Sequence, residues 1–143
     1  MYLVPLAPGR ATFTLEDVER AAYDASLGRV ETPIGAIQIE TPVRRRRGER
    51  FDFQEMKKVA AWARTHNAGL HLDGARLFLE SAYAARPVKE YTALFDTVYI
   101  SMYKYLNAAS DGGARGFRSG WLRWVSPRVP ARRRRRRVPR LRG

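Results

Sequence analysis

The chain has 143 residues, enough for one domain with a hydrophobic core and too few for two large domains. It contains no cysteine, which excludes disulfides, thiolate catalysis and cysteine-based zinc sites, and its two histidines argue against a multi-histidine metal site. Residues 112–143 hold 12 Arg and no acidic residue, so they carry +12 of the net charge of +13; the remaining 15 basic residues nearly balance the 14 acidic ones. The start, MYLVPLAPGR, has neither the basic segment of a signal peptide nor an apolar run that could span a membrane. We therefore expect a cytoplasmic protein with no membrane partner.

The first third of the chain predicts one helix and one strand. Thr14 is placed to cap a helix over LEDVERAAYDA, with Asp17 as its third residue, and this helix should end near Gly28. Residues 35–40, GAIQIE, alternate apolar and polar side chains as a strand does. Thr41-Pro42 should end the strand, because proline cannot donate to a sheet ladder. The arginines of residues 44–50 are expected to form a solvated loop.

The middle of the chain continues the alternation of helices and strands. Asp52 is placed to cap a helix over residues 53–67, whose apolar face is formed by Phe53, Met56, Val59, Ala60 and Ala63. A strand over residues 69–73, a short helix over 75–86 that Pro87 ends or restarts, and a strand over 95–104 follow. This order predicts an α/β fold with a mostly parallel sheet, flanking helices and right-handed crossovers over residues 1–111.

Residues 112–143 have a different composition from the rest. Gly, Pro and Arg make up 20 of these 32 residues, and the segment has no helical or strand period. A GC-rich gene read in a shifted frame gives this composition, so we expect a disordered basic tail or a frame-shifted sequence. The Arg132–Arg137 run with Trp121 and Trp124 also leaves open binding to nucleic acid, through phosphate contacts and base stacking. No framework positions these residues, so a nucleic-acid partner is the alternative and not the main expectation.

Ionisable residues end two of the predicted strands, at Asp73 and at Lys104. Ligands of parallel α/β sheets bind beyond the carboxyl ends of the strands, and alternation puts His71 and Asp73 on the same side of theirs. A lysine desolvated by neighbouring tyrosines has a lowered pKa and attacks carbonyls, and a carboxylate that pairs with a ring nitrogen suits pyridoxal phosphate. The pattern alone leaves open that Asp73 caps the next helix and that Lys104 is solvated.

Two motifs carry a resemblance to a known family. LHLDGARLF resembles the signature of the threonine aldolase and aromatic amino acid β-eliminating lyase family, which are fold-type I pyridoxal-phosphate enzymes, and FDTVYISMYKYLNAAS resembles their cofactor-lysine segment. The resemblance covers roughly residues 12–110 and implies a fragment of the large domain of such an enzyme. It implies that Lys104 binds the cofactor aldehyde and that Asp73 keeps the ring nitrogen protonated. Arg76 would anchor the substrate carboxylate or the ring's phenolate oxygen. His71 belongs to the cofactor-binding motif, and either contacts the cofactor or makes a structural hydrogen bond.

The implied reaction cleaves a β-hydroxy-α-amino acid such as threonine into glycine and an aldehyde. The chain departs from the family pattern at Tyr103 and Tyr105, which flank the lysine where many threonine aldolases have Ser and Gly. The family's phosphate cup, ring-stacking residue and small C-terminal domain have no counterpart here, so we expect an inactive or impaired fragment of low solubility. Full-length members are homo-oligomers. The resemblance stops at Asp111, which favours the frame-shift hypothesis.

Overall fold

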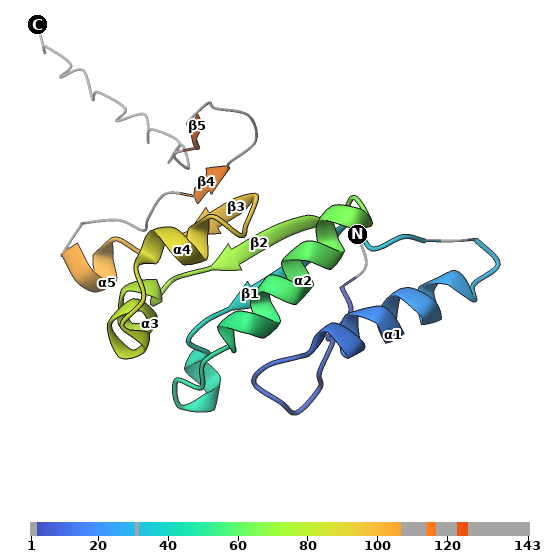
Figure 1. Cartoon of the computed structure of the whole chain (residues 1–143), viewed down its shortest axis with the longest axis horizontal. Coiled ribbons are helices and arrows are strands. Elements are labelled where there is room, and N and C mark those ends of the chain that lie inside the picture. Colours follow the sequence, from blue (N-terminus) through green and yellow to red (C-terminus); the bar gives the residue numbers. More distant parts are fainter. Residues whose placement is uncertain (1–2, 31, 107–113, 117–122, 126–143) are drawn as a thin grey trace, which may run out of the picture.

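The computed structural model describes residues 3–30, 32–106, 114–116 and 123–125 (Figure 1). Its sheet has the order β1-β2-β3-β4-β5, formed by Ala36–Glu40, Gly69–Asp73, Thr97–Tyr99, Ala114–Gly116 and Arg123–Val125. The first three strands run parallel, whereas β4 and β5 pair antiparallel. The predicted α/β class, with a parallel sheet and flanking helices, is confirmed.

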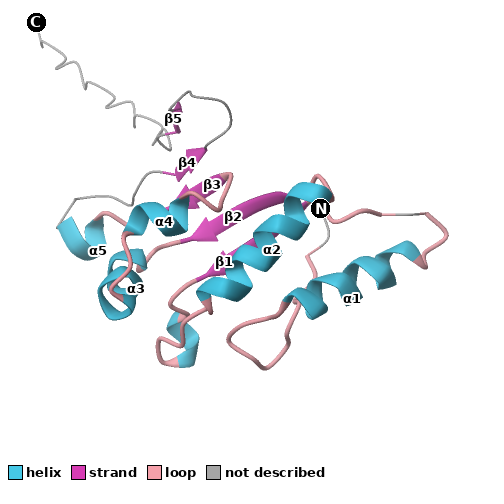
Figure 2. Ribbon diagram, in the orientation of Figure 1, coloured by secondary structure: helices cyan, strands magenta, loops and turns pink. Residues whose placement is uncertain are grey.

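The core lies between the sheet and the helix α2, Phe53–Thr65 (Figure 2). Strand alternation turns Leu70 and Leu72 of β2 into this core, together with Ile37 and Ile39 of β1. The face predicted for α2 is correct: four of its five apolar residues are buried and the fifth, Phe53, is half-buried. The opposite face of β2 therefore carries the polar side chains.

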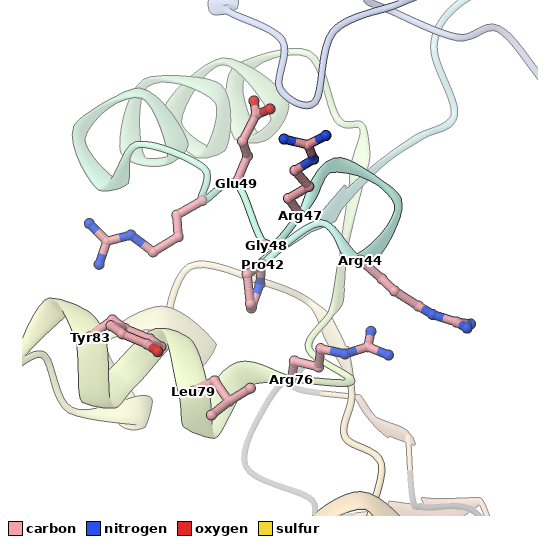
Figure 3. A pocket seen from close by; sticks show the side chains of 9 residues that line it. Pro42, Arg44, Arg47, Gly48, Glu49, Arg76, Leu79 and Tyr83 are labelled. Atoms are coloured by element: carbon pink, nitrogen blue, oxygen red, sulfur yellow. The ribbon is translucent and has the colours of Figure 1, made fainter.

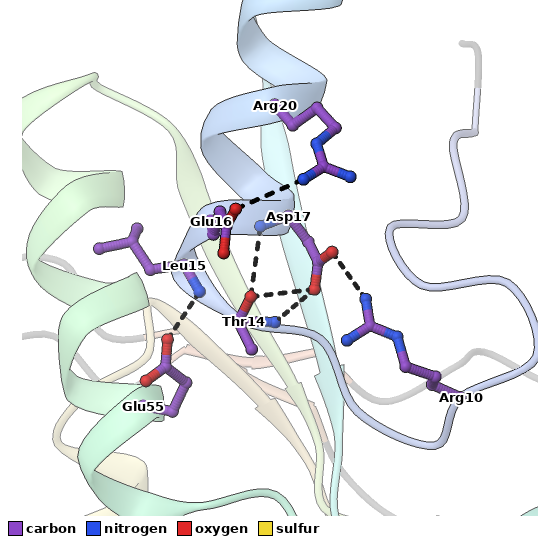
Figure 4. Close-up of polar contacts among 7 residues, drawn as sticks. All are labelled: Arg10, Thr14, Leu15, Glu16, Asp17, Arg20 and Glu55. Atoms are coloured by element: carbon purple, nitrogen blue, oxygen red, sulfur yellow. Dashed lines mark hydrogen bonds and ion pairs between the residues drawn. The ribbon is translucent and has the colours of Figure 1, made fainter.

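Two cap motifs fix where the first helices begin. The helix α1, Leu15–Ser26, starts with the predicted capping box, in which Thr14 N–H donates to Asp17 Oδ2 at 2.8 Å and Asp17 N–H donates to Thr14 Oγ1 at 3.4 Å (Figure 4). The bond from the Thr14 amide, helped by Arg10, holds the pKa of Asp17 below its usual value. Asp52 caps α2 as predicted, accepting from Glu55 N–H at 2.8 Å. Glu55 in turn accepts from Leu15 N–H at 2.7 Å, which joins the start of α1 to α2.

The elements after β2 are shorter than predicted. The helix expected over residues 75–86 is α3, Leu77–Ala84, followed by a separate helix α4, Val88–Thr92, that begins after Pro87. The strand expected over 95–104 is wrong in its second half, because β3 ends at Tyr99 and residues Tyr103–Leu106 form a short helix, α5. Tyr99 pairs with Asp73, the last residue of β2, so β3 has no parallel partner beyond that point.

The predicted tail is described only at β4 and β5, two short strands that the sequence pattern did not predict. The Arg132–Arg137 run and Trp121, on which the nucleic-acid alternative depends, lie outside the described residues. Within the described part of the chain, no helix is long and apolar enough to cross a membrane.

Candidate active site

Asp73 lies at the carboxyl end of the central parallel strand. In the sheet register it is the partner of Glu40 on one side and of Tyr99 on the other. Its Oδ1 accepts from the backbone N–H of Ala75 at 3.1 Å, and its other carboxylate oxygen forms no hydrogen bond or ion pair within the described residues. Asp73 does not cap the next helix, whose N-cap position is Arg76. Its half-buried carboxylate thus keeps one oxygen available at the sheet edge.

His71 lies on the same strand face as Asp73, two residues earlier. Its ring Nδ1 is 2.7 Å from Thr97 Oγ1, and the two residues are register partners across β2 and β3. This bond ties the two strands together just before their carboxyl ends. It is the kind of structural hydrogen bond that the sequence led us to expect of His71.

A tight turn carries the chain from Asp73 to Arg76. Gly74 N–H donates to Tyr99 O at 2.9 Å, which brings the turn against the end of β3. A Cβ at position 74 would lie 3.0 Å from that carbonyl oxygen and 3.1 Å from the Leu77 Cβ. The lack of a side chain at Gly74 therefore lets the turn approach Tyr99 and Leu77 closely. The result is a half-buried Arg76 at the start of α3.

The helix that carries Lys104 packs against this turn region. The rings of Tyr105 and Phe78 meet edge to face with centroids 5.3 Å apart, which joins α5 to α3. Burial raises the pKa of Tyr105, and the nearby positive charge of Arg76 opposes that shift. The buried Tyr105 hydroxyl forms no hydrogen bond of normal geometry among the described residues, although it lies close to the backbone of Leu79. The fold therefore brings the Arg76 turn and the Lys104 helix together, although 28 residues separate them in the sequence.

Lys104 itself is half-buried on α5. The prediction that it ends a strand is wrong. Its Nζ lies 5.0 Å from the centroid of the Tyr103 ring, within the range of a cation–π contact. No ion pair with a described carboxylate engages this amine. Tyr103, one of the two residues that depart from the family pattern, therefore has its ring beside the Lys104 amine.

An open pocket of about 570 Å³ adjoins Arg76 (Figure 3). Four of its nine lining residues are arginines, namely Arg44, Arg47, Arg50 and Arg76. The sequence placed the first three in a solvated loop and missed this grouping. A usable signal was their position directly after β1, because the carboxyl ends of neighbouring parallel strands meet at one edge of the sheet.

Cation ligands are scarce in this region. No group of three or more His, Cys, Asp or Glu side chains that could hold a metal ion occurs among the residues that the structure describes. The donor set at the edge of the sheet consists instead of a carboxylate, an amine and guanidinium groups. Such a set fits an organic ligand with a basic ring nitrogen, a carbonyl and anionic groups.

Comparison with known proteins gives consistent matches. The family model described as beta-eliminating lyase matches residues 2–113. The low specificity L-threonine aldolase of Saccharomyces cerevisiae is 29% identical over 108 residues, which are 74% of this chain and 27% of that protein. The alanine racemase TOXG of Cochliobolus carbonum is 43% identical over 54 residues, which are 38% of this chain and 14% of that protein. A crystal structure from Listeria monocytogenes, assigned as an L-allo-threonine aldolase, matches with a TM-score of 0.57 and 30% identity, covering 72% of this chain and 26% of that one. The chain thus spans about a quarter of the length of the aldolases that it matches.

Proposed function

The chain belongs to the beta-eliminating lyase family, as its motifs predicted, and on that basis we propose that it carries the lysine and aspartate segment of a pyridoxal-phosphate-dependent lyase. The reaction that we propose cleaves the Cα–Cβ bond of a β-hydroxy-α-amino acid, such as threonine, to give glycine and an aldehyde. The observation that carries this proposal is the packing of the Asp73–Arg76 turn against the helix of Lys104. For the whole protein we further propose a homo-oligomeric, cytoplasmic enzyme, with residues 1–111 as part of its catalytic domain.

The residues at the sheet edge have the chemistry that pyridoxal phosphate needs. The free carboxylate oxygen of Asp73 suits a protonated ring nitrogen, and the amine of Lys104 suits the cofactor aldehyde. When bound, the cofactor supplies an electron sink for the pair released as the Cα–Cβ bond breaks. The contact between the segments that carry these two residues, through Tyr105 and Phe78, supports a shared site.

Three further roles follow for this chain's own side chains. Arg76 would hold the substrate carboxylate, because its guanidinium forms no ion pair with a described residue and borders the pocket. The Lys104 Nζ would accept and return the proton of the substrate hydroxyl or Cα, once freed from the cofactor. His71 would position Thr97 and the end of β3 without touching substrate.

Chemical trapping tests the role of Lys104. The full chain is mixed with pyridoxal phosphate, reduced with borohydride and digested, and the modified lysine is identified by mass spectrometry. We expect the label at Lys104, whereas Lys89 on α4, which is exposed, serves as the matched internal control. Asp73→Asn should lower labelling at Lys104 and leave Lys89 unchanged. Equal labelling of the two lysines in the unmodified chain would contradict the proposed function.

A further inference from the structure

The pocket beside Arg76 combines a strong positive charge with apolar walls. Its four arginines face one acidic side chain, Glu49, so the lining carries a formal charge of +3. None of the four guanidinium groups forms an ion pair with a described residue. Leu79 and Tyr83, both exposed, form part of the opposite wall. Like charges gathered in this way repel one another, and an anionic ligand relieves that repulsion.

The arginines come from two separate segments of the chain. Arg44, Arg47 and Arg50 belong to the loop after β1, whereas Arg76 belongs to the turn after β2. In Figure 3 the side chains of Arg44 and Arg76 extend toward the same side of the pocket. A run of basic residues along a single exposed loop would not by itself produce this arrangement. The grouping results from the pairing of β1 with β2.

The loop of residues 42–50, here called the arginine loop, is closed by a buried anchor. Thr41 Oγ1 accepts from Phe51 N–H at 3.1 Å, so the residues that flank the loop are joined directly. The same hydroxyl donates to Glu80 Oε2 at 3.2 Å, and Glu80 Oε1 accepts from Tyr91 O–H at 3.0 Å. Thr41, Glu80 and Tyr91 are all buried. Glu80 forms no ion pair with the arginines among the described residues, and these bonds organise the anchored loop before any ligand arrives.

We propose that this pocket binds a second anionic group of the substrate, so that the enzyme acts on β-hydroxy-α-amino acids whose side chains end in a carboxylate or a phosphate. The inference rests on the proposed function through Arg76, which follows Asp73 by three residues and lines the pocket. The substrate's α-carboxylate is held at Arg76, and its distal oxyanion is held by Arg44, whose side chain extends to the same side of the pocket (Figure 3). Leu79 and Tyr83 contact the apolar part of the side chain between them. The volume of about 570 Å³ falls in the range of roughly 300–1,000 Å³ that small-molecule sites occupy.

Titration calorimetry on the full chain without cofactor tests this site. Succinate is the probe, acetate is the singly charged comparison, and inorganic phosphate tests the other oxyanion. We expect saturable succinate binding that is tighter than acetate binding, and Arg44→Gln should weaken it by about tenfold through loss of a charge-assisted contact. Arg45→Gln is the matched control, because Arg45 is in the same 3₁₀ turn, is exposed and does not line the pocket. Tighter binding of phosphate than of succinate identifies a phosphorylated side chain, and the reverse order a carboxylated one.

Two results would overturn the inference. One is an equal loss of succinate binding in Arg44→Gln and Arg45→Gln, which would indicate attraction to the overall charge and not a site. The other is loss of succinate binding after pyridoxal phosphate has been reduced onto Lys104, which would show that the pocket holds the cofactor's own phosphate. The titration needs no cofactor, so the two proposals fail separately. A lack of cofactor labelling at Lys104 in the trapping experiment contradicts only the proposed function, whereas a lack of succinate binding in the titration contradicts only this inference.

Discussion

Replacing Tyr91 with phenylalanine tests the anchor beneath the arginine loop. The Tyr91 side chain is fully buried, and its hydroxyl donates to Glu80 at 3.0 Å. Removing the hydroxyl leaves one oxygen of a buried carboxylate without its donor, and a hydrogen bond to a charged group contributes about 1.5–3 kcal/mol. We therefore expect Tyr91→Phe to lower the free energy of unfolding by about 2 kcal/mol at pH 8.

The same hydroxyl gives the variant a distinctive pH dependence. Burial, followed by the bond to Glu80, raises the pKa of Tyr91 from 10.0 to about 12. The folded chain thus retains the phenol proton to a higher pH than the unfolded chain does. The stabilisation is complete below pH 10 and is lost as the pH rises toward 12, and a shift of this size corresponds to about 2–3 kcal/mol. Tyr91→Phe lacks this part of the alkaline decline.

Urea denaturation of the full chain between pH 8 and about pH 11.5 measures both effects. Tyr83→Phe is the matched control, because Tyr83 is 79% exposed and its loss should change neither the stability nor its pH dependence. If Tyr91→Phe were as stable as Tyr83→Phe at pH 8 and declined in parallel with it, the buried anchor would be refuted. The argument for a preorganised arginine loop would then fail with it.

Three further substitutions test other contacts. Gly74→Ala should destabilise the fold by about 1–3 kcal/mol in urea denaturation, because its Cβ would lie 3.0 Å from the Tyr99 carbonyl oxygen. Glu55→Gln should weaken the acid dependence of the melting temperature, because the bond from Leu15 N–H lowers the pKa of Glu55. The stabilisation by the Glu55 carboxylate is present above the pKa of the unfolded chain and is lost as the pH falls through the pKa of the folded chain. Tyr105→Phe should leave stability unchanged or raise it by up to about 1 kcal/mol, because its buried hydroxyl forms no hydrogen bond of normal geometry among the described residues.

Each of these variants has a control of the same kind. Gly35→Ala places a Cβ with no atom within 4 Å and should cost little, so an equal loss in both glycine variants would contradict the packing argument. Glu19→Gln changes an exposed α1 residue and should leave the acid dependence as it is. Tyr23→Phe changes a side chain that is 63% exposed, and a clear loss in Tyr105→Phe relative to it would mean that the Tyr105 hydroxyl has a partner.

The sequence predicted the starts of α1 and α2 well because local chemistry encodes them. Thr14 and Asp52 each satisfy a backbone N–H only three residues away, so their role depends on little else. Asn67 has a φ of 53°, a left-handed conformation that asparagine adopts readily after the end of a helix. The alternation in β2 was also predicted correctly, because burial of the apolar side chains on one face of the strand leaves His71 and Asp73 on the opposite face.

Long-range pairing explains what the sequence could not provide. The residues after Tyr99 have the apolar and aromatic character of a strand, yet β2 ends opposite Tyr99 and offers them no partner. The arginines of the arginine loop are exposed, as predicted, but nothing local reveals that Thr41 is anchored to Glu80, 39 residues later. In both cases the deciding contact lies on another element.

The helical position of Lys104 changes how the two family motifs depend on each other. Had β3 continued to residue 104, the sheet ladder would have held the lysine independently of the turn after Asp73. The short helix α5 depends instead on the contact of Tyr105 with Phe78, which belongs to α3. Since α3 begins at Arg76, directly after the turn that Gly74 fastens to β3, a shift of α3 would move the lysine relative to the carboxylate. The two motifs, 31 residues apart in the sequence from Asp73 to Lys104, are therefore joined through α3, and Phe78→Ala should alter the environment of the Lys104 helix.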